Sequence, residues 1–260
     1  MTMLMFLLSF AVASASDMEP FIVGGTRAPI SDWPFITFIE ISEFSYFAAA
    51  CGGSLISSQT VLTAAHCLDD FTEKKTLDAI TFKIYMGHAS HARARMIREV
   101  IDYETPEQYS PDDFDVTADI GIMFLKRPVD FVANVQKAIL QRSFSFNKDR
   151  TLVVAGWGNT EPGEKSSSSW WLKAVAMKTK PYQKCRELYR VICAKNNKEY
   201  PYSGDSGGPV VNAVTRQQVG IVSVRDMDTG ITILTSVPEY WEWIRRTQLK
   251  LFQKFCGKAK

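Results

Sequence analysis

The amino-acid sequence predicts an all-β protein that ends in one helix. After the first 21 residues, the chain is a series of short apolar or alternating runs separated by turn residues. Strands do not alternate with helices as they would in βαβ units, and no long repeat or linker between domains is found. With 260 residues, 46% of them hydrophobic, the chain can bury one sizeable core.

Six segments have the composition or the alternation of strands. In one of them polar and apolar residues alternate strictly from Thr81 to Met86, which is typical of a strand with one buried face. The six segments are Phe35–Ile39, Val61–Ala64, Thr81–Met86, Leu152–Ala155, Val219–Val224 and Ile231–Leu234.

The helix is expected from Glu239 to about Phe255. Trp243, Ile244 and Leu251 recur at helical intervals, so this face should pack on the β structure. The tail also carries four lysines, Lys250, Lys254, Lys258 and Lys260. They leave open a contact with a membrane surface or a polyanion, although basic surface helices are common.

The amino-terminal residues have the features of a signal peptide. Met3–Val12 is apolar apart from Ser9, and small residues follow from Ala13 to Ser16. This run is too short to span a bilayer, and no other stretch is long enough, so no membrane span is expected. No Lys or Arg precedes Arg27, which departs from the usual pattern. We therefore expect a signal peptide at residues 1–15 and a secreted, extracellular protein, for which five cysteines are suitable.

Three short segments carry residues that could act together in nucleophilic catalysis. Thr63–Cys67 contains His66, Ala118–Ile122 contains Asp119, and Gly204–Pro209 contains Ser206. Each segment alone has an ordinary structural explanation, as a packed histidine, a plain loop or a glycine-rich turn. A serine hydroxyl, however, needs a base to become a nucleophile, and a carboxylate can orient that base. The order His, Asp, Ser is the one that chymotrypsin-like proteases use.

The sequence resembles the chymotrypsin (trypsin-like) family of serine proteases over about Ile22–Arg246. Besides the three segments above, the matching residues are Ile22–Gly25, Cys51–Ile56, Gly156–Gly158 and Gly220–Ser223. The resemblance implies a fold of two six-stranded antiparallel β-barrels with a C-terminal helix. It also implies a single protease domain over residues 22–260.

The resemblance also implies a role for each residue of the site. His66, Asp119 and Ser206 would form the catalytic triad, with His66 as general base and Asp119 orienting its imidazole. The backbone N–H groups of Gly204 and Ser206 would form the oxyanion hole, and Ser223 would support the buried aspartate.

Activation and disulfides follow from the same resemblance. Residues 16–21 would be a short propeptide, and the ammonium group freed at Ile22 would pair with Asp205. Phe21 stands where most relatives have Arg or Lys, which argues against a trypsin-like activator. A chymotrypsin-like activator or an exopeptidase would replace it. The implied disulfides are Cys51–Cys67 and Cys185–Cys193, which leaves Cys256 either free or bridged to another chain.

The substrate pocket departs from the family pattern. Tyr200 occupies the position of the Asp that selects basic side chains, so trypsin-like specificity is not expected. Val224 and Arg225 replace the usual Trp-Gly pair, and Thr232 stands where a second glycine normally lies. Side chains in place of two glycines would narrow the pocket or fill it, which favours small or apolar substrate residues. The expected pocket residues are Tyr200, Ser203, Ser223, Val224, Arg225 and Thr232.

An acidic pocket formed by Glu199, Asp226 and Asp228 is the alternative for specificity. No metal and no cofactor are expected, because His88 and His91 lack acidic or cysteine partners nearby in the sequence. A net charge of only +2 argues against nucleic acid as the main partner. The expected partners are a protein or peptide substrate, an activating protease and a proteinaceous inhibitor.

The sequence thus predicts a secreted serine endopeptidase that works through an acyl-enzyme and has non-tryptic specificity. The alternative from another class is a catalytically inactive, secreted protease homologue that binds or regulates a partner. The altered pocket and the Phe21–Ile22 junction favour that alternative, whereas the complete triad opposes it. A membrane-active protein that uses the basic tail is a third hypothesis, which only the tail supports.

Overall fold

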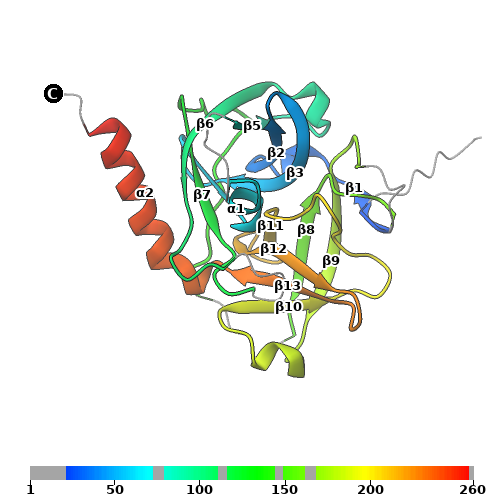
Figure 1. Ribbon diagram of the computed structural model, residues 1–260. Coiled ribbons are helices and arrows are strands. Elements are labelled where there is room, and N and C mark those ends of the chain that lie inside the picture. Colours follow the sequence, from blue (N-terminus) through cyan, green and yellow to red (C-terminus); the bar gives the residue numbers. More distant parts are fainter. Residues whose placement is uncertain (1–21, 73–78, 111–115, 144–148, 162–167, 258–260) are drawn as a thin grey trace, which may run out of the picture.

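The structure, a computed structural model, describes residues 22–72, 79–110, 116–143, 149–161 and 168–257. The predicted signal peptide and propeptide, together with Lys258 and Lys260, lie outside these residues. Two β-barrels lie side by side, with a long helix along the outside of the first (Figure 1). Both barrels are antiparallel, as predicted.

The first half of the chain forms a closed six-stranded barrel. Its hydrogen-bonded order is β2-β3-β4-β7-β6-β5. The strands are β2 (Ile36–Glu43), β3 (Tyr46–Leu55), β4 (Thr60–Thr63), β5 (Ile80–Met86), β6 (Met96–Glu104) and β7 (Gly121–Leu125). In β5 the apolar residues Ile80, Phe82, Ile84 and Met86 are buried, whereas Thr81 and Lys83 are exposed, so the predicted alternation is confirmed. Helix α1 (His66–Thr72) directly follows β4.

The second half forms the other six-stranded barrel. Its order is β9-β10-β13-β12-β11-β8, and a β8–β9 pairing closes it. The short strand β1 (Thr26–Arg27) adds to the outside of β9. The strands are β8 (Thr151–Gly156), β9 (Lys173–Thr179), β10 (Val191–Lys195), β11 (Pro209–Asn212), β12 (Gln218–Asp226) and β13 (Ile231–Ser236). Four single-turn 3₁₀ helices are η1 (Ile30–Asp32), η2 (His91–Arg93), η3 (Gln183–Arg186) and η4 (Pro238–Tyr240).

The carboxyl-terminal helix α2 (Trp241–Cys256) packs on the first barrel. Ile244 and Leu251 are buried, and Phe124 of β7 stacks on Phe255 with ring centroids 5.1 Å apart. The expected helix and its apolar face are therefore confirmed. No helix among the described residues is both long and apolar enough to cross a membrane.

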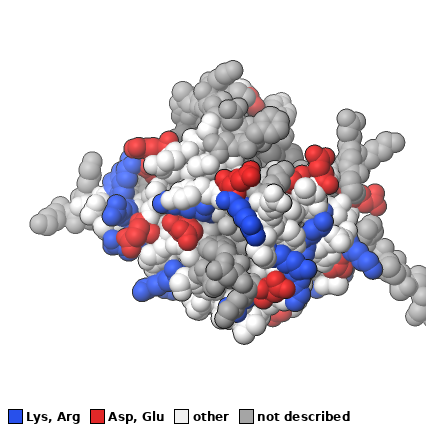
Figure 2. Space-filling view, turned by 90° about the horizontal axis from the view of Figure 1, so that it is seen from below, with Lys and Arg blue, Asp and Glu red and all other residues white. Residues whose placement is uncertain are grey.

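Two lysines of the tail pair with carboxylates of β6. Lys250 lies 2.7 Å from Glu104, and Lys254 lies 2.6 Å from Asp102. These two ion pairs link α2 to β6 of the first barrel. On the face of the molecule that Figure 2 shows, Lys and Arg side chains are interspersed with Asp and Glu, which agrees with a net charge near zero.

Candidate active site

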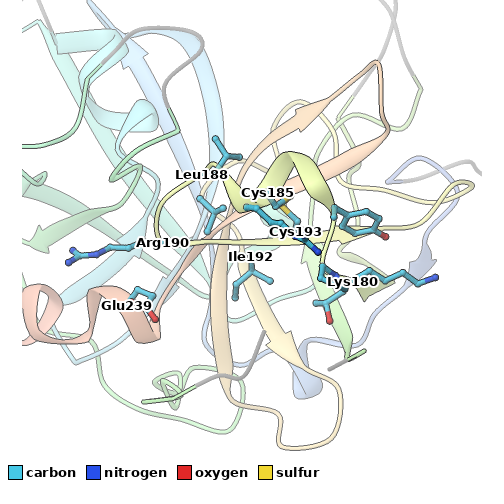
Figure 3. Close-up of a pocket in the computed structure, with 12 residues that line it drawn as sticks. Lys180, Cys185, Leu188, Arg190, Ile192, Cys193 and Glu239 are labelled. Carbon is cyan, nitrogen blue, oxygen red and sulfur yellow. A yellow bond between two sulfur atoms is a disulfide. The ribbon is translucent and has the colours of Figure 1, made fainter. Parts of the chain in front are cut away.

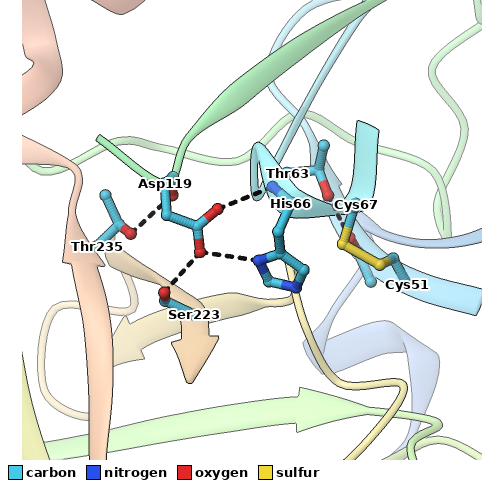
Figure 4. A network of polar contacts seen from close by, with 8 residues as sticks. Cys51, Thr63, His66, Cys67, Asp119, Ser223 and Thr235 are labelled. Atoms are coloured by element: carbon cyan, nitrogen blue, oxygen red, sulfur yellow. Dashed lines mark hydrogen bonds and ion pairs between the residues drawn. A yellow bond between two sulfur atoms is a disulfide. The ribbon is translucent and has the colours of Figure 1, made fainter. Parts of the chain in front are cut away.

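A hydrogen-bond network centred on Asp119 joins the two barrels (Figure 4). Asp119 Oδ2 lies 2.9 Å from His66 Nδ1 and accepts a hydrogen bond from Ser223 Oγ at 2.5 Å. Its other oxygen, Oδ1, accepts from the backbone N–H of His66 at 3.0 Å. These bonds fix both the backbone and the ring of His66 relative to one carboxylate.

The carboxylate of Asp119 is buried but stays ionised. Burial by itself would raise its pKa, yet the charge and hydrogen bond of His66 and the hydrogen bond of Ser223 outweigh that effect, so the pKa of Asp119 is held below its usual value. A buried anion beside an imidazole favours the tautomer that carries its proton on Nδ1, and it stabilises the imidazolium.

Neighbouring strands hold this pair in place. His66 is the first residue of α1, and the disulfide Cys51–Cys67 ties the next residue to β3. Asp119 comes just before β7, where Thr235 of β13 donates a hydrogen bond to its backbone oxygen at 2.7 Å. Thr235 was not predicted as a site residue, because its contact with Asp119 spans 116 positions and has no local sequence signal.

Ser206 lies in the tight turn before β11, packed against the segment that leads to His66. Its backbone oxygen accepts a hydrogen bond from Gly52 at 2.7 Å. A Cβ on Gly207 would stand 2.5 Å from the oxygen of Gly52 and 3.0 Å from the nitrogen of Ala64, two residues before His66. The turn can approach this closely because Gly207 has no side chain and adopts a φ of +77°.

The backbone of this turn presents the N–H groups expected for an oxyanion hole. Gly204 has a φ of +91°, which favours glycine. Within the described part of the chain, no hydrogen bond from the N–H of Gly204 or Ser206 is found. Both groups are therefore open to an external acceptor such as a substrate oxygen.

Asp205 is fully buried beneath the same turn. Its carboxylate accepts hydrogen bonds from the N–H groups of Gly158 at 2.8 Å and Tyr202 at 3.0 Å. Burial raises the pKa of Asp205 to about 7 because these two bonds only partly offset it. Among the described residues, no cationic side chain forms an ion pair with Asp205. Ile22, its predicted partner, is buried in the core of the second barrel within an uncleaved chain.

Gly156 and Gly158 make room for Asp205. A Cβ on either glycine would overlap the Asp205 carboxylate. We predict that Gly158→Ala lowers the free energy of unfolding by about 1–3 kcal/mol, the usual cost of an overpacked core. Urea unfolding would measure this loss. The control is Gly220→Ala, whose new Cβ has no neighbour closer than 3.2 Å. Equal stability of Gly158→Ala and the parent would contradict the close packing of Asp205.

A pocket of about 270 Å³ opens beside Ser206. Of the predicted pocket residues, Ser203, Ser223, Val224, Arg225 and Thr232 line it. Tyr200 does not line it but lies behind Arg225, whose guanidinium carbon is 3.6 Å from the centre of the tyrosine ring. The pocket is also lined by four residues that were not predicted from the sequence, Pro201, Tyr202, Val222 and Met227.

The acidic residues proposed for an alternative pocket lie elsewhere. Glu199, Asp226 and Asp228 are not part of the lining. The carboxylate of Asp226 accepts hydrogen bonds from the backbone of Asp228 and Thr229 and from the hydroxyl of Thr229, so it caps the β12–β13 turn. Glu199 packs beside Gly24.

A second and larger hollow, of about 540 Å³, lies beside the disulfide Cys185–Cys193 (Figure 3). It shares no lining residue with the pocket at Ser206. Lys180, Arg190 and Glu239 border it, and the pair of bonded sulfurs forms part of its wall (Figure 3). Ser206, the predicted nucleophile, lines the smaller pocket and not this hollow, so the smaller pocket is the candidate active site.

Both disulfides implied by the resemblance are present, and Cys256 is exposed and forms no disulfide with a described residue. Cys51, His66 and Cys67 are the one close group of potential metal ligands among the described residues. Their sulfurs are bonded to each other, so this group does not offer thiolates to a metal. The rings of His88 and His91 pack instead near Trp171 and Trp170.

Comparisons with known proteins agree on one family. A family model described as Trypsin matches residues 22–244. The chain is 29% identical over 224 residues to clotting factor C of Tachypleus tridentatus, covering 77% of this chain and 22% of that protein. It is 26% identical over 256 residues to the proclotting enzyme of the same species, covering 86% of this chain and 65% of that protein.

Limulus clotting factor C of Carcinoscorpius rotundicauda is also 29% identical over 224 residues, with 77% of this chain and 22% of that protein covered. The chain thus spans less than two thirds of the length of these curated relatives. A solved collagenase structure, HL collagenase, has the same fold, with a TM-score of 0.74 and 22% identity over 87% of this chain and 98% of that one.

Proposed function

Because the chain belongs to the trypsin family of serine endopeptidases, we propose that it hydrolyses peptide bonds with His66, Asp119 and Ser206 as its catalytic triad. The observation that carries this proposal is the network in which Asp119 binds both the ring and the backbone of His66. The turn that holds Ser206 packs against the segment before His66, which supports the assignment of the nucleophile.

The proposed reaction proceeds in two steps, formation of an acyl-enzyme and its hydrolysis. In the first, Oγ of Ser206 attacks the substrate carbonyl while His66 takes the hydroxyl proton, and the resulting imidazolium is stabilised by the ionised Asp119. The backbone N–H groups of Gly204 and Ser206 would hold the oxyanion. His66 then returns the proton to the leaving amine, which yields an acyl-enzyme. Water, deprotonated by the same histidine, releases the acyl group in the second step.

We further propose that the protein is secreted and made as a precursor. Residues 1–15 would be the signal peptide, residues 16–21 the propeptide and residues 22–260 the protease domain. The two disulfides favour an oxidising compartment. An activating protease would free Ile22, and the new ammonium group would pair with Asp205, for which no cationic partner is found among the described residues. A proteinaceous inhibitor is an expected partner besides the peptide substrate.

The proposed specificity is non-tryptic. A basic substrate residue needs an acid in the pocket, and no described carboxylate lines it. The small or apolar preference inferred from the sequence rests on the side chains of Arg225 and Thr232 in place of glycines.

The test of the proposed function is labelling by a fluorophosphonate probe, which reacts with an activated serine. A recombinant precursor would carry the recognition sequence of a specific protease in place of residues 16–21, so that cleavage frees Ile22. We expect the cleaved protein to be labelled and the variants Ser206→Ala and His66→Ala to remain unlabelled. Near-ultraviolet circular dichroism of each variant would establish that the fold is kept.

The alternative, an inactive homologue that binds or regulates a partner, is favoured by the replacement of glycines in the pocket wall. This alternative would be the better explanation if the cleaved protein were folded but not labelled. That result would mean that the triad or the oxyanion hole does not assemble after cleavage.

A further inference from the structure

The pocket beside Ser206 contains the side chain of an arginine. Arg225 lies on β12 two residues after Ser223, and both residues line the pocket. Arg225 pairs with Thr232 across the β12–β13 ladder, beyond a register shift between Val222 and Val224. Both Arg225 and Thr232 line the pocket.

Two contacts fix the guanidinium group. Nη1 of Arg225 donates a hydrogen bond to the hydroxyl of Thr232 at 3.2 Å, and Thr232 is fully buried. The group also lies over the ring of Tyr200, at 3.6 Å from the guanidinium carbon to the ring centre. A guanidinium has five N–H donors, and these contacts use one of them. The rest remain available within a rigid, planar group.

The charge of Arg225 is not paired within the described part of the chain, where no carboxylate forms an ion pair with it. Asp226 attracts it at longer range, but that carboxylate caps the β12–β13 turn. Arg225 is partly buried, and this burial lowers the pKa of its guanidinium group, which nevertheless stays protonated at neutral pH.

We propose that the pocket selects substrates whose residue before the scissile bond carries a carboxylate, that is, Glu or Asp. This inference rests on the proposed function and names the substrate class of the same site. A carboxylate would receive charge-assisted hydrogen bonds from the fork of Arg225. The hydroxyl of Ser203, which lines the same pocket, would be a further donor.

An apolar substrate residue would be a worse fit. It would displace water from the guanidinium without replacing the lost hydrogen bonds, and an unpaired buried charge is costly. A lysine or arginine would add repulsion between like charges. The same arginine that narrows the pocket therefore changes its preference from small or apolar residues to acidic ones.

The experiment compares isosteric peptides that differ only in that residue. Internally quenched peptides with Glu, Gln, Asp, Asn, Ala or Leu would be cleaved by the protein processed to begin at Ile22. We expect kcat/KM for Glu or Asp to exceed that for the matching amide by about 10- to 100-fold, the range of charge-assisted hydrogen bonds. Arg225→Gln should abolish this ratio. The matched control Arg246→Gln, an exposed arginine on α2, should keep it.

A binding measurement separates this inference from the proposed function. Fluorescence anisotropy would compare the Glu and Gln peptides on Ser206→Ala and on Ser206→Ala/Arg225→Gln, so that no cleavage is needed. Preference for Glu that depends on Arg225 supports the pocket assignment even if the probe fails to label the parent. If the probe labels the parent but peptides with Ala or Leu are cleaved in preference to those with Glu or Asp, the pocket assignment is wrong while the proposed protease function holds. No preference in binding or in cleavage would also overturn it.

Discussion

Asp119→Asn is expected to lower kcat/KM of the processed protein by about 10⁴-fold, the size of effect that follows loss of the correct histidine tautomer. In the parent, both oxygens of Asp119 accept hydrogen bonds from His66, one from the ring and one from the backbone. An amide has one acceptor oxygen, so its NH₂ group would face at least one of these donors. The imidazole would then turn or present the wrong nitrogen to Ser206.

Steady-state cleavage of a quenched peptide would measure this effect, with Ser223→Ala as the matched control. Ser223 donates its hydrogen bond to Oδ2 of Asp119, the oxygen that also binds the ring of His66. Its removal should cost about 1.5–3 kcal/mol, or roughly 10- to 150-fold, because one hydrogen bond to a charged group is lost. Equal losses in the two variants would mean that Asp119 acts only as a structural hydrogen-bond acceptor.

The six segments predicted as strands from short apolar or alternating runs fall in β2, β4, β5, β8, β12 and β13, whereas β7 and β9 have similar runs and were not predicted. Strand β5 is the clearest case, because each of its inward positions is apolar. Strand β3 could not be predicted in this way. It contains Ala48–Ala50 and the pair Gly52-Gly53, residues that are uncommon in strands, and it forms because both of its neighbours in the barrel pair with it.

The glycines of β3 explain why packing overrides that local preference. A Cβ on Gly52 would stand 2.7 Å from the Cα of Gly208, in the turn that holds Ser206. A Cβ on Gly53 would stand 2.7 Å from Thr37 Oγ1 and 2.9 Å from Val61 Cγ1, both inside the first barrel. Gly52 therefore lets the two barrels approach each other, whereas Gly53 lets the strands of the first barrel pack closely. Contacts between segments distant in the chain leave no periodic signal in the sequence.

For the site, the motifs predicted which residues would gather but not how the pocket would be arranged. The Asp119–His66 pair could be inferred from the order of the motifs. The stacking of Arg225 on Tyr200 could not, since it depends on the register shift in β12 and on where a long, flexible side chain comes to rest. The sequence placed Arg225 in the pocket wall as an obstruction, whereas the structure places a fixed charge there.

Asp205→Asn should remove a large pH dependence from the stability of the uncleaved chain. The folded-state pKa of Asp205, about 7, lies above its usual 3.8, so the native state favours the protonated form. Asp205 therefore makes its full contribution to the free energy of unfolding below pH 4, where it is protonated. This contribution is lost as the pH rises through 7. The shift corresponds to about 4 kcal/mol. Urea unfolding of the precursor at pH 4, 6 and 8 would measure the decline, and the variant should show a decline smaller by that amount.

Cleavage before Ile22 should turn the ionised carboxylate of Asp205 from a destabilising group into a stabilising one in the parent, but not in the asparagine variant. A new ammonium group beside Asp205 would favour the ionised carboxylate and lower its pKa, so the cleaved parent should be more stable than its precursor at pH 8 by about 3–5 kcal/mol, the usual cost of breaking a buried ion pair. The asparagine variant should gain nothing on cleavage. Its kcat/KM should also fall by about 10²–10³-fold, because the turn that presents the N–H groups of Gly204 and Ser206 would not be fixed. A variant that keeps parental activity after cleavage would contradict the pairing of Ile22 with Asp205, and would leave the ordering of the oxyanion turn to the hydrogen bonds from Gly158 and Tyr202.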